Sequence, residues 1–208
     1  MDLGCKDIGA WKEALASYQT KLESLQKPQL ISLDDFYRTQ LPVAIQSRKP
    51  VPYITKSEIS QLMKWKLSRG KWRPRLLDFV TSLSEEEVES ASKKAFGSLP
   101  DLAKAISELT VLKGVGPATA SAVLAAYAPD IAPFMSDEAM MATLGNKKDY
   151  NLKQYLKLSD KLQEKAKELN LEGNYFTPSD VERALWSSCI TSSKSEHTNK
   201  KQKRKRQS

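Results

Sequence analysis

The chain has 208 residues, 28% of them charged, and a formal net charge of +8, which suits one ordinary domain with a core of its own. It has no apolar run near the ~20 residues that a membrane span needs, and no basic stretch followed by an apolar one at its start, so we expect neither a membrane protein nor a secreted one. Cys5 and Cys189 are the only cysteines and form no C-x-x-C pair, which excludes a four-thiolate zinc site or iron–sulfur cluster within the chain. His197 is the single histidine, which argues against Ser-His-Asp catalysis. We therefore predict no metal and no cofactor.

Apolar residues recur at helical spacing along residues 1–190, and no segment alternates as a strand does. The boundaries come from capping boxes at Thr55 and Ser84, from Ser136 and Thr177 as caps, and from Pro and Gly. We therefore predict a single all-α domain of about ten helices. In chain order they cover residues 11–25, a short element from 33 that ends near Leu41-Pro42, 55–69, 74–80, 84–97, 100–111, 117–128, 137–144, 152–169 and 177–186.

Positive charge is concentrated in two segments. Residues 56–75 and residues 191–208 each contain seven Lys or Arg and one Glu, so the rest of the chain is net acidic. This distribution argues against a uniformly basic surface. It indicates a polyanionic partner, with nucleic acid favoured over an anionic membrane surface.

Within the first basic segment, residues 64–75 interleave two tryptophans with six cations. Lys and Arg can neutralise phosphates, and Trp can stack on an unpaired base. We predict nucleic-acid contacts from Arg69, Lys71, Trp72 and Arg73. The alternative is that Trp65 and Trp72 are core residues with exposed cationic neighbours, and this alternative is favoured for Trp65 because it lies on the same helical line as Leu62.

The most informative stretch is LKGVGPATASAVL, which runs from Leu112 to Leu124. A helix ends, Gly114 and Gly116 turn the chain, and Pro117 begins the next helix. Glycines permit positive φ and close approach of the backbone, and a helix N-terminus presents N–H groups and a positive dipole end. This combination predicts a site for an anionic oxygen, most naturally a phosphate. The alternative is a tight turn between two closely packed helices.

The stretch resembles the helix-hairpin-helix DNA-binding motif, whose pattern is apolar, any residue, Gly, apolar, Gly, followed by Ala and two apolar residues at fixed offsets. We place the whole motif at residues 101–128. The resemblance implies contacts to the DNA backbone, which we assign to the turn and to the first residues after it. These are Lys113, Gly114, Val115, Gly116, Ala118 and Thr119.

The residues after the hairpin resemble the base-excision DNA glycosylases (the endonuclease III-like, HhH-GPD superfamily). In that superfamily an Asp opens a helix shortly after the hairpin, and Asp137 matches it, 21 residues after Gly116 and one more than the closest pattern. The resemblance covers roughly residues 99–144, and it implies a glycosylase-like helical body in which Asp137 is catalytic. Asp137 also suits an ordinary helix N-terminus, so a purely structural role stays open.

Three features depart from the superfamily. The lysine that bifunctional members carry two residues after the second Gly is Ala118 here, which implies a monofunctional enzyme without a Schiff-base step. The iron–sulfur cluster of many members is absent. Glu138 adds a second negative charge where DNA is expected to approach, which counts against catalysis.

Residues 191–208 are polar and patternless, and we predict that they are disordered. Their basic cluster is typical of a nuclear-import signal read by an import receptor, and it predicts a nuclear protein. A solubilising tail is the alternative. The cluster consists of Lys200, Lys201, Lys203, Arg204, Lys205 and Arg206.

Three functions are therefore open: a monofunctional DNA glycosylase, a catalytically inactive relative that binds DNA structure, and a scaffold for protein partners that retains the fold. The first requires that Asp137 face a cleft shared by the hairpin and the segment from Arg69 to Arg75. That cleft must have room for a nucleotide extruded from the duplex.

Overall fold

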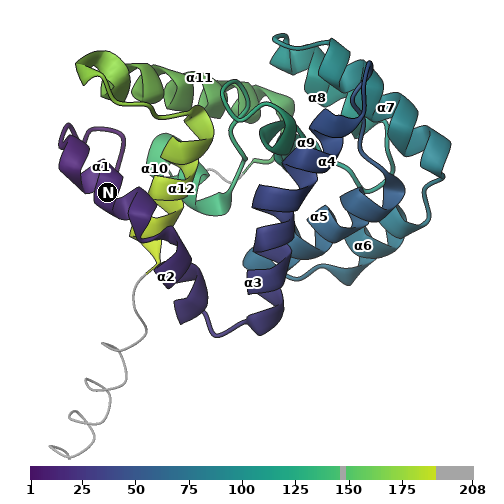
Figure 1. Ribbon diagram of the computed structural model, residues 1–208, viewed down its shortest axis with the longest axis horizontal. Helices are drawn as coiled ribbons and strands as arrows, with labels where there is room; N and C mark the ends of the chain where they lie inside the picture. Colours follow the sequence, from purple (N-terminus) through teal and green to yellow (C-terminus); the bar gives the residue numbers. More distant parts are fainter. Residues whose placement is uncertain (146–148, 191–208) are drawn as a thin grey trace, which may run out of the picture.

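The computed structural model describes residues 1–145 and 149–190, and all regular structure in these ranges is helical (Figure 1). It contains twelve α-helices, one π-helical segment and one 3-10 segment, with no strand in the part of the chain that it describes. The prediction of an all-α body is confirmed. The predicted import cluster, Lys200 to Arg206, lies outside the described residues.

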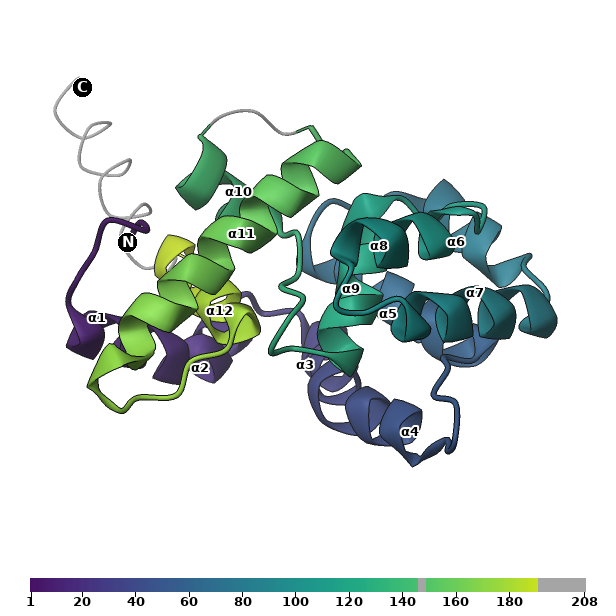
Figure 2. The same cartoon turned by 90° about the horizontal axis from the view of Figure 1, so that it is seen from above.

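The helices form two groups (Figures 1 and 2). The first group brings the two ends of the body together, because α12 packs against α1, α2, α10 and α11. Its members are α1 (Ile8–Ala16), α2 (Tyr18–Ser24), α10 (Asp137–Leu144), α11 (Leu152–Leu169), which runs into the 3-10 segment Asn170–Glu172, and α12 (Pro178–Cys189).

The second group is contiguous in sequence. It consists of α5 (Lys56–Arg69), α6 (Pro74–Thr81), α7 (Glu85–Gly97), α8 (Leu102–Thr110) and α9 (Pro117–Tyr127). The chain reaches it through α3 (Pro28–Asp35), the π-helical segment Phe36–Gln40 and α4 (Leu41–Ser47), and returns to the first group through residues 128–136.

Helix α9 lies at the centre of the molecule. Every residue from Thr119 to Ala126 is buried, and the helix packs against α4, α5, α8 and α11. Four of these buried residues are alanines, which allow neighbouring helices to approach closely. Because the hairpin turn leads directly into α9, the turn is held by the core rather than by a loop of its own.

The helix starts that the sequence predicted from caps at Thr55, Ser84, Ser136 and Thr177 are confirmed, whereas the caps at Asp7 and Asp101 were missed. Thr55 and Ser84 form reciprocal capping boxes with Glu58 and Glu87, and Thr177 forms one with Asp180. Ser136 caps α10 by accepting a hydrogen bond from the backbone of Ala139. Each cap satisfies an N–H group that the first helical turn leaves unpaired, which explains why these boundaries are readable from sequence.

Two predicted helices have the wrong extent. The single helix expected over residues 11–25 is interrupted at Ser17, which separates α1 from α2. The element expected to run from residue 33 to near Leu41-Pro42 instead begins at Pro28 and continues to Ser47. The π-helical segment shifts the hydrogen-bond register, with the Leu41 N–H donating to the Phe36 carbonyl. Pro42 then falls in the first turn of α4, where a missing N–H costs little.

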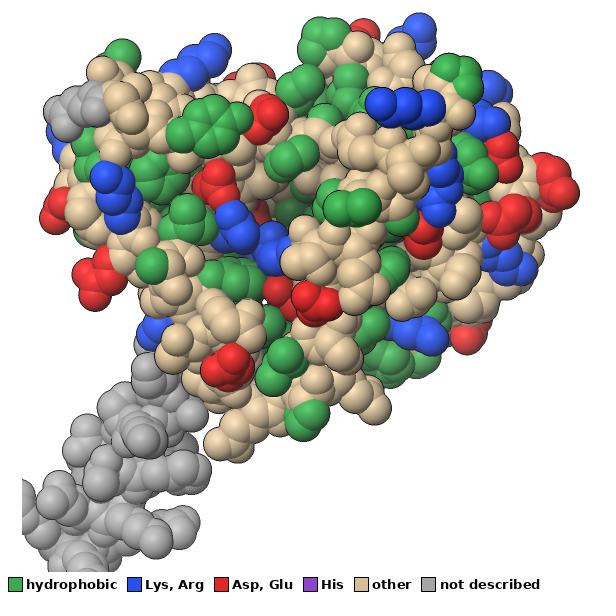
Figure 3. All heavy atoms as spheres, viewed as in Figure 1, with side chains coloured by type: hydrophobic (Ala, Val, Ile, Leu, Met, Phe, Trp, Pro, Cys, Tyr) green, Lys and Arg blue, Asp and Glu red, His purple; other side chains and the backbone are tan. Residues whose placement is uncertain are grey.

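Positive and negative side chains are mixed over the face of the body seen in Figure 3, so this face is not uniformly basic. None of the helices in the described ranges is long and apolar enough to cross a membrane.

Candidate functional site

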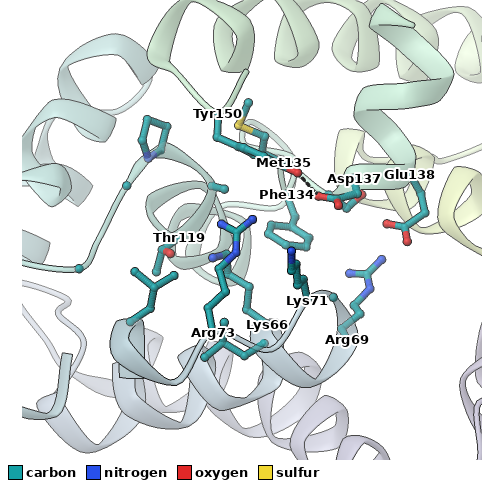
Figure 4. A pocket seen from close by; sticks show the side chains of 18 residues that line it. Lys66, Arg69, Lys71, Arg73, Thr119, Phe134, Met135, Asp137, Glu138 and Tyr150 are labelled. Carbon is teal, nitrogen blue, oxygen red and sulfur yellow. Dashed lines mark hydrogen bonds between the residues drawn. The ribbon is translucent and has the colours of Figure 1, made fainter. Parts of the chain in front are cut away.

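A pocket of about 270 Å³ lies where the two helix groups meet. Its walls come from the end of α5 and the loop after it, the hairpin between α8 and α9, the linker before α10, and the first residues of α10 (Figure 4). Tyr150, just before α11, completes the lining. The structure thus brings Asp137, the hairpin glycines and the basic loop together around one cavity, although they are far apart in sequence.

Of the two glycines in the turn, the fold requires Gly114 but not Gly116. Gly114 has a φ of +86°, and a Cβ there would lie 2.7 Å from the Cβ of Phe79 on α6. Gly116 has an extended conformation with φ −95° and ψ 179°, and a Cβ there would meet no atom within 4 Å. Of the two properties expected of these glycines, Gly114 uses the positive φ and Gly116 the absence of a side chain. Its lack of a side chain leaves open space beside the N-terminus of α9.

That N-terminus has no side-chain cap. The Gly116 carbonyl accepts hydrogen bonds from the backbone N–H groups of Thr119 and Ala120, both at 2.9 Å, as a helix start requires. Earlier N–H groups, such as that of Ala118, have no intrahelical acceptor by geometry. Gly116, Ala118 and Thr119 all line the pocket. The turn therefore has the geometry expected of an anion site.

The side chains of the predicted hairpin contacts divide into two sets. Val115 and Thr119 are 4% and 2% exposed, and of these two only Thr119 lines the pocket. Lys113 is exposed, but its Nζ lies 4.8 Å from the centre of the Phe79 ring and the residue does not line the pocket. The hairpin residues that line the cavity are Gly114, Gly116, Pro117, Ala118 and Thr119.

Asp137 is the first residue of α10 and lines the pocket. Its Oδ1 accepts a hydrogen bond of 2.5 Å from the Tyr150 hydroxyl (Figure 4). The capping of α10 is carried out by Ser136, so the helix does not need the Asp137 carboxylate as its cap. The linker is tied to α9 by the Met135 N–H, which donates to the Ser121 hydroxyl at 3.0 Å. This bond fixes the start of α10 relative to the hairpin.

The predicted basic contacts separate into exposed and buried residues. Lys71 and Arg73 are exposed and line the pocket, and Trp72 is 54% exposed in the loop between them. Arg69 is different, because its guanidinium is buried and its Nη2 donates to Glu182 Oε1 at 2.9 Å. Arg69 lines the pocket, but its side chain is 3% exposed, so the prediction of an exposed phosphate contact is wrong for this residue. Trp65 is fully buried, as the alternative interpretation expected.

Three further titratable groups line the pocket: Glu138, which the sequence pointed to, and Lys66 and Tyr150, which it did not single out. Burial lowers the pKa of Lys66 to about 8, and the positive charge of Arg73 contributes in the same direction. Burial raises the pKa of Glu138, helped by the charges of Glu182 and Asp137 and opposed by that of Arg69. For Tyr150, burial and the hydrogen bond to Asp137 raise the pKa to about 12, so its hydroxyl keeps its proton near neutral pH.

Sequence reasoning also missed Glu182 and Tyr150. Glu182 had a readable signal, because it lies one helical turn before Trp186 on the apolar side of α12, where an unpaired acid would be costly. No sequence signal pointed to Tyr150, because its contact with Asp137 depends on the tertiary fold and not on a local pattern.

Comparison of the chain with protein-family models, with curated proteins and with solved structures finds no significant match. The resemblance to the helix-hairpin-helix glycosylases therefore depends on the residues of the hairpin and on Asp137.

Proposed function

We propose that this protein binds duplex DNA through the hairpin and the loop after α5, and that it acts as a monofunctional DNA N-glycosylase on a nucleotide extruded into the pocket. The observation that supports this proposal is the shared pocket. The backbone of Gly116 and Ala118, the cations Lys71 and Arg73, and the carboxylate of Asp137 all line one cavity. Phosphate-binding groups therefore adjoin a candidate catalytic acid.

Hydrolysis of an N-glycosidic bond builds positive charge on the sugar and needs an activated water on the face opposite the leaving base. A carboxylate can stabilise that charge and accept the proton of the water. The Tyr150 hydroxyl, which donates to Oδ1, restricts the rotation of the Asp137 carboxylate. Extrusion of the base costs a few kcal/mol and costs least for a damaged or mispaired base, which favours such bases as substrates.

The product should be an intact abasic site. Ala118 occupies the position of the lysine that performs strand cleavage in bifunctional members, and Lys113 is directed at Phe79 instead. Lys66 is the lysine that lines the pocket together with Lys71. Trapping of a covalent protein–DNA adduct with borohydride would contradict the monofunctional assignment, and Lys66 would be the first residue to replace.

The experiment that tests this function is release of free base from a panel of duplexes that each carry one damaged or mismatched base. The Asp137→Asn variant keeps the shape of the side chain and removes its charge. It should release base at least ~10²-fold more slowly, the lower range for a positioned general base. DNA affinity should stay equal or rise, because a negative charge near phosphate is lost. Asp160→Asn, an exposed acid on α11, is the matched control.

A catalytically inactive DNA-binding protein is the second candidate. It is favoured by one observation: Tyr150 already occupies one oxygen of Asp137, and Glu138 places a second acid beside it. Specific binding to damaged or mismatched duplexes without base release across the panel would support this candidate and contradict the first. A chain that binds no DNA would leave only the protein scaffold.

We also propose that the tail directs the protein to the nucleus through an import receptor that reads the cluster from Lys200 to Arg206. A chain that ends at Ile190 should then lose nuclear accumulation. Equal accumulation of the shortened and full chains would assign the tail to solubility instead.

A further inference from the structure

Two adjacent acids line the pocket in different surroundings. Asp137 and Glu138 are the first two residues of α10, and both line the cavity (Figure 4). Asp137 accepts a hydrogen bond from the Tyr150 hydroxyl at 2.5 Å, and a donor of this kind stabilises the ionised carboxylate. Within residues 1–145 and 149–190, the donor to the Glu138 carboxylate is its own backbone N–H. Of the two acids, Asp137 is therefore the better placed to carry a negative charge.

The surroundings of Glu138 favour its protonated form. In Figure 4 its carboxylate points toward the Arg69 guanidinium, but that guanidinium is paired with Glu182 of α12, with Nη2 and Oε1 2.9 Å apart. Burial raises the pKa of Glu138, and the charges of Glu182 and Asp137 act in the same direction. Arg69 and the backbone N–H of Glu138 oppose this shift without cancelling it. Glu138 therefore keeps its proton to a higher pH than an ordinary glutamate does.

Further cations near α10 lie across the cavity or are bonded elsewhere. Lys66 and Arg73 lie on the other side of the pocket from the two acids, and Lys71 belongs to the exposed loop after α5. On α11, which packs against α10, the Lys161 Nζ donates to the Thr143 carbonyl near the opposite end of α10. None of these cations is an ion-pair partner of the second acid in the described part of the chain. The pocket thus holds one acid suited to the ionised form and one suited to the protonated form.

Release of a neutral base needs a proton as well as a water molecule. When the glycosidic bond breaks, its electron pair stays on the ring nitrogen of the base, and a base that departs as an anion is a poor leaving group. A carboxylic acid that protonates the departing group removes this difficulty. Two carboxyl groups with different protonation states in one site divide this work in glycoside hydrolysis, one as the acid and the other as the base.

We propose that Glu138 is a second catalytic residue, the general acid that protonates the departing base while Asp137 accepts the proton of the attacking water. The Glu138 carboxyl gives its proton to a ring nitrogen of the base, the bond between that base and C1′ of the sugar breaks, and the base leaves as a neutral molecule. The water oxygen bonds to C1′, and its proton passes to Asp137. Exchange with solvent then restores both acids. This inference rests on the proposed function, and it gives Glu138 a neutral form at the moment of reaction.

The test measures base release by the full chain from the same panel of duplexes, at pH values from about 5 to 9. The panel includes the neutral purines hypoxanthine and adenine, and N7-methylguanine, which is already cationic and leaves as a neutral molecule without taking a proton. In the wild type, release of a neutral base should fall as the pH rises through the pKa of Glu138, because the acid form is lost. Release of N7-methylguanine should not show this decline.

The Glu138→Gln variant cannot give up a proton. It should release neutral bases at least ~10²-fold more slowly, the lower range for a positioned general acid, and it should lose the decline at high pH. Release of N7-methylguanine should slow far less. Glu86→Gln is the matched control, since Glu86 is the exposed second residue of α7, as Glu138 is the second of α10. A purely structural role of Glu138 would slow the release of all bases alike and leave the pH profile unchanged.

The pH profile of Glu138→Gln is the deciding result. A decline at high pH that persists in this variant, equal slowing of neutral and methylated bases, or wild-type release confined to N7-methylguanine would each overturn the inference. In each of these cases the protein would still release a base, so the proposed function would stand. Release of no base from any duplex would overturn both.

Discussion

Gly114 and Gly116 lie two positions apart in one turn, but their surroundings differ. Gly114→Ala forces a side chain into a left-handed conformation and against Phe79, so it should lower the free energy of unfolding by about 1–3 kcal/mol. Gly116→Ala should change it by less than about 0.5 kcal/mol, as a substitution into open space. Urea denaturation of both variants checks this. Equal destabilisation by the two substitutions would mean that the turn geometry is different.

Lys66 gives the proposed DNA surface a pH dependence. Its pKa of about 8 means that it is mostly charged at pH 7 and mostly neutral at pH 9. A phosphate nearby favours the charged form, so binding takes up a proton and affinity should fall as pH rises through 8, by up to about tenfold between pH 7 and pH 9. DNA titrations at constant salt measure this.

In the Lys66→Arg variant the side chain stays charged up to pH 9, so the fall of DNA affinity with rising pH should be smaller. Lys64→Arg, an exposed position on the same helix, should keep the decline seen in the wild type. Wild-type affinity that is constant from pH 7 to pH 9 would show that Lys66 does not approach phosphate.

At the scale of elements, the ion pair of Arg69 and Glu182 joins α5 to α12 and hence the two helix groups. Both side chains are nearly fully buried, and the guanidinium carbon lies 4.7 Å from the centre of the Trp186 ring. Glu182→Leu leaves the arginine charge unpaired in the interior, so it should lower the free energy of unfolding by about 3–5 kcal/mol.

The double variant Arg69→Met with Glu182→Leu removes both charges and should recover most of that loss. Glu89→Gln, which breaks the partly exposed pair with Lys93 on α7, is the control and should cost less than about 1 kcal/mol. If the double variant instead loses the sum of the unfolding free energies that the two single variants lose, the two side chains do not interact energetically.

Four helix starts were predictable because a local cap determines them, although the cap at Asp7, which starts α1 at Ile8, was missed. Thr55, Ser84 and Ser136 mark their helices through bonds within the first turn. The break at Ser17 has no Gly or Pro to announce it. The continuation through Pro42 depends on a local π-helical register, which a rule that ends helices at proline cannot anticipate.

At the scale of the whole molecule, the site was only partly readable from sequence. Asp137 and the hairpin were identified because their spacing is local, and the structure places both at the pocket. The position of Arg69 was not readable, because its partner Glu182 is 113 residues away and comes close only when α5 and α12 meet in the folded chain. The pocket likewise depends on tertiary packing, since its walls come from four stretches of chain that lie far apart in the sequence.

If this protein binds DNA as proposed, the backbone beside Gly116 is where a phosphate binds. The most direct measurement is the affinity of Gly116→Val for duplex DNA, with its unfolding free energy measured in parallel and with Gly97→Val as the control at another glycine with open surroundings. The extended backbone of Gly116 suits valine, so stability should be unchanged. The side chain should block the phosphate and weaken binding at least about tenfold, whereas the control binds as the wild type does. Unchanged affinity in a stably folded Gly116→Val protein would contradict the account.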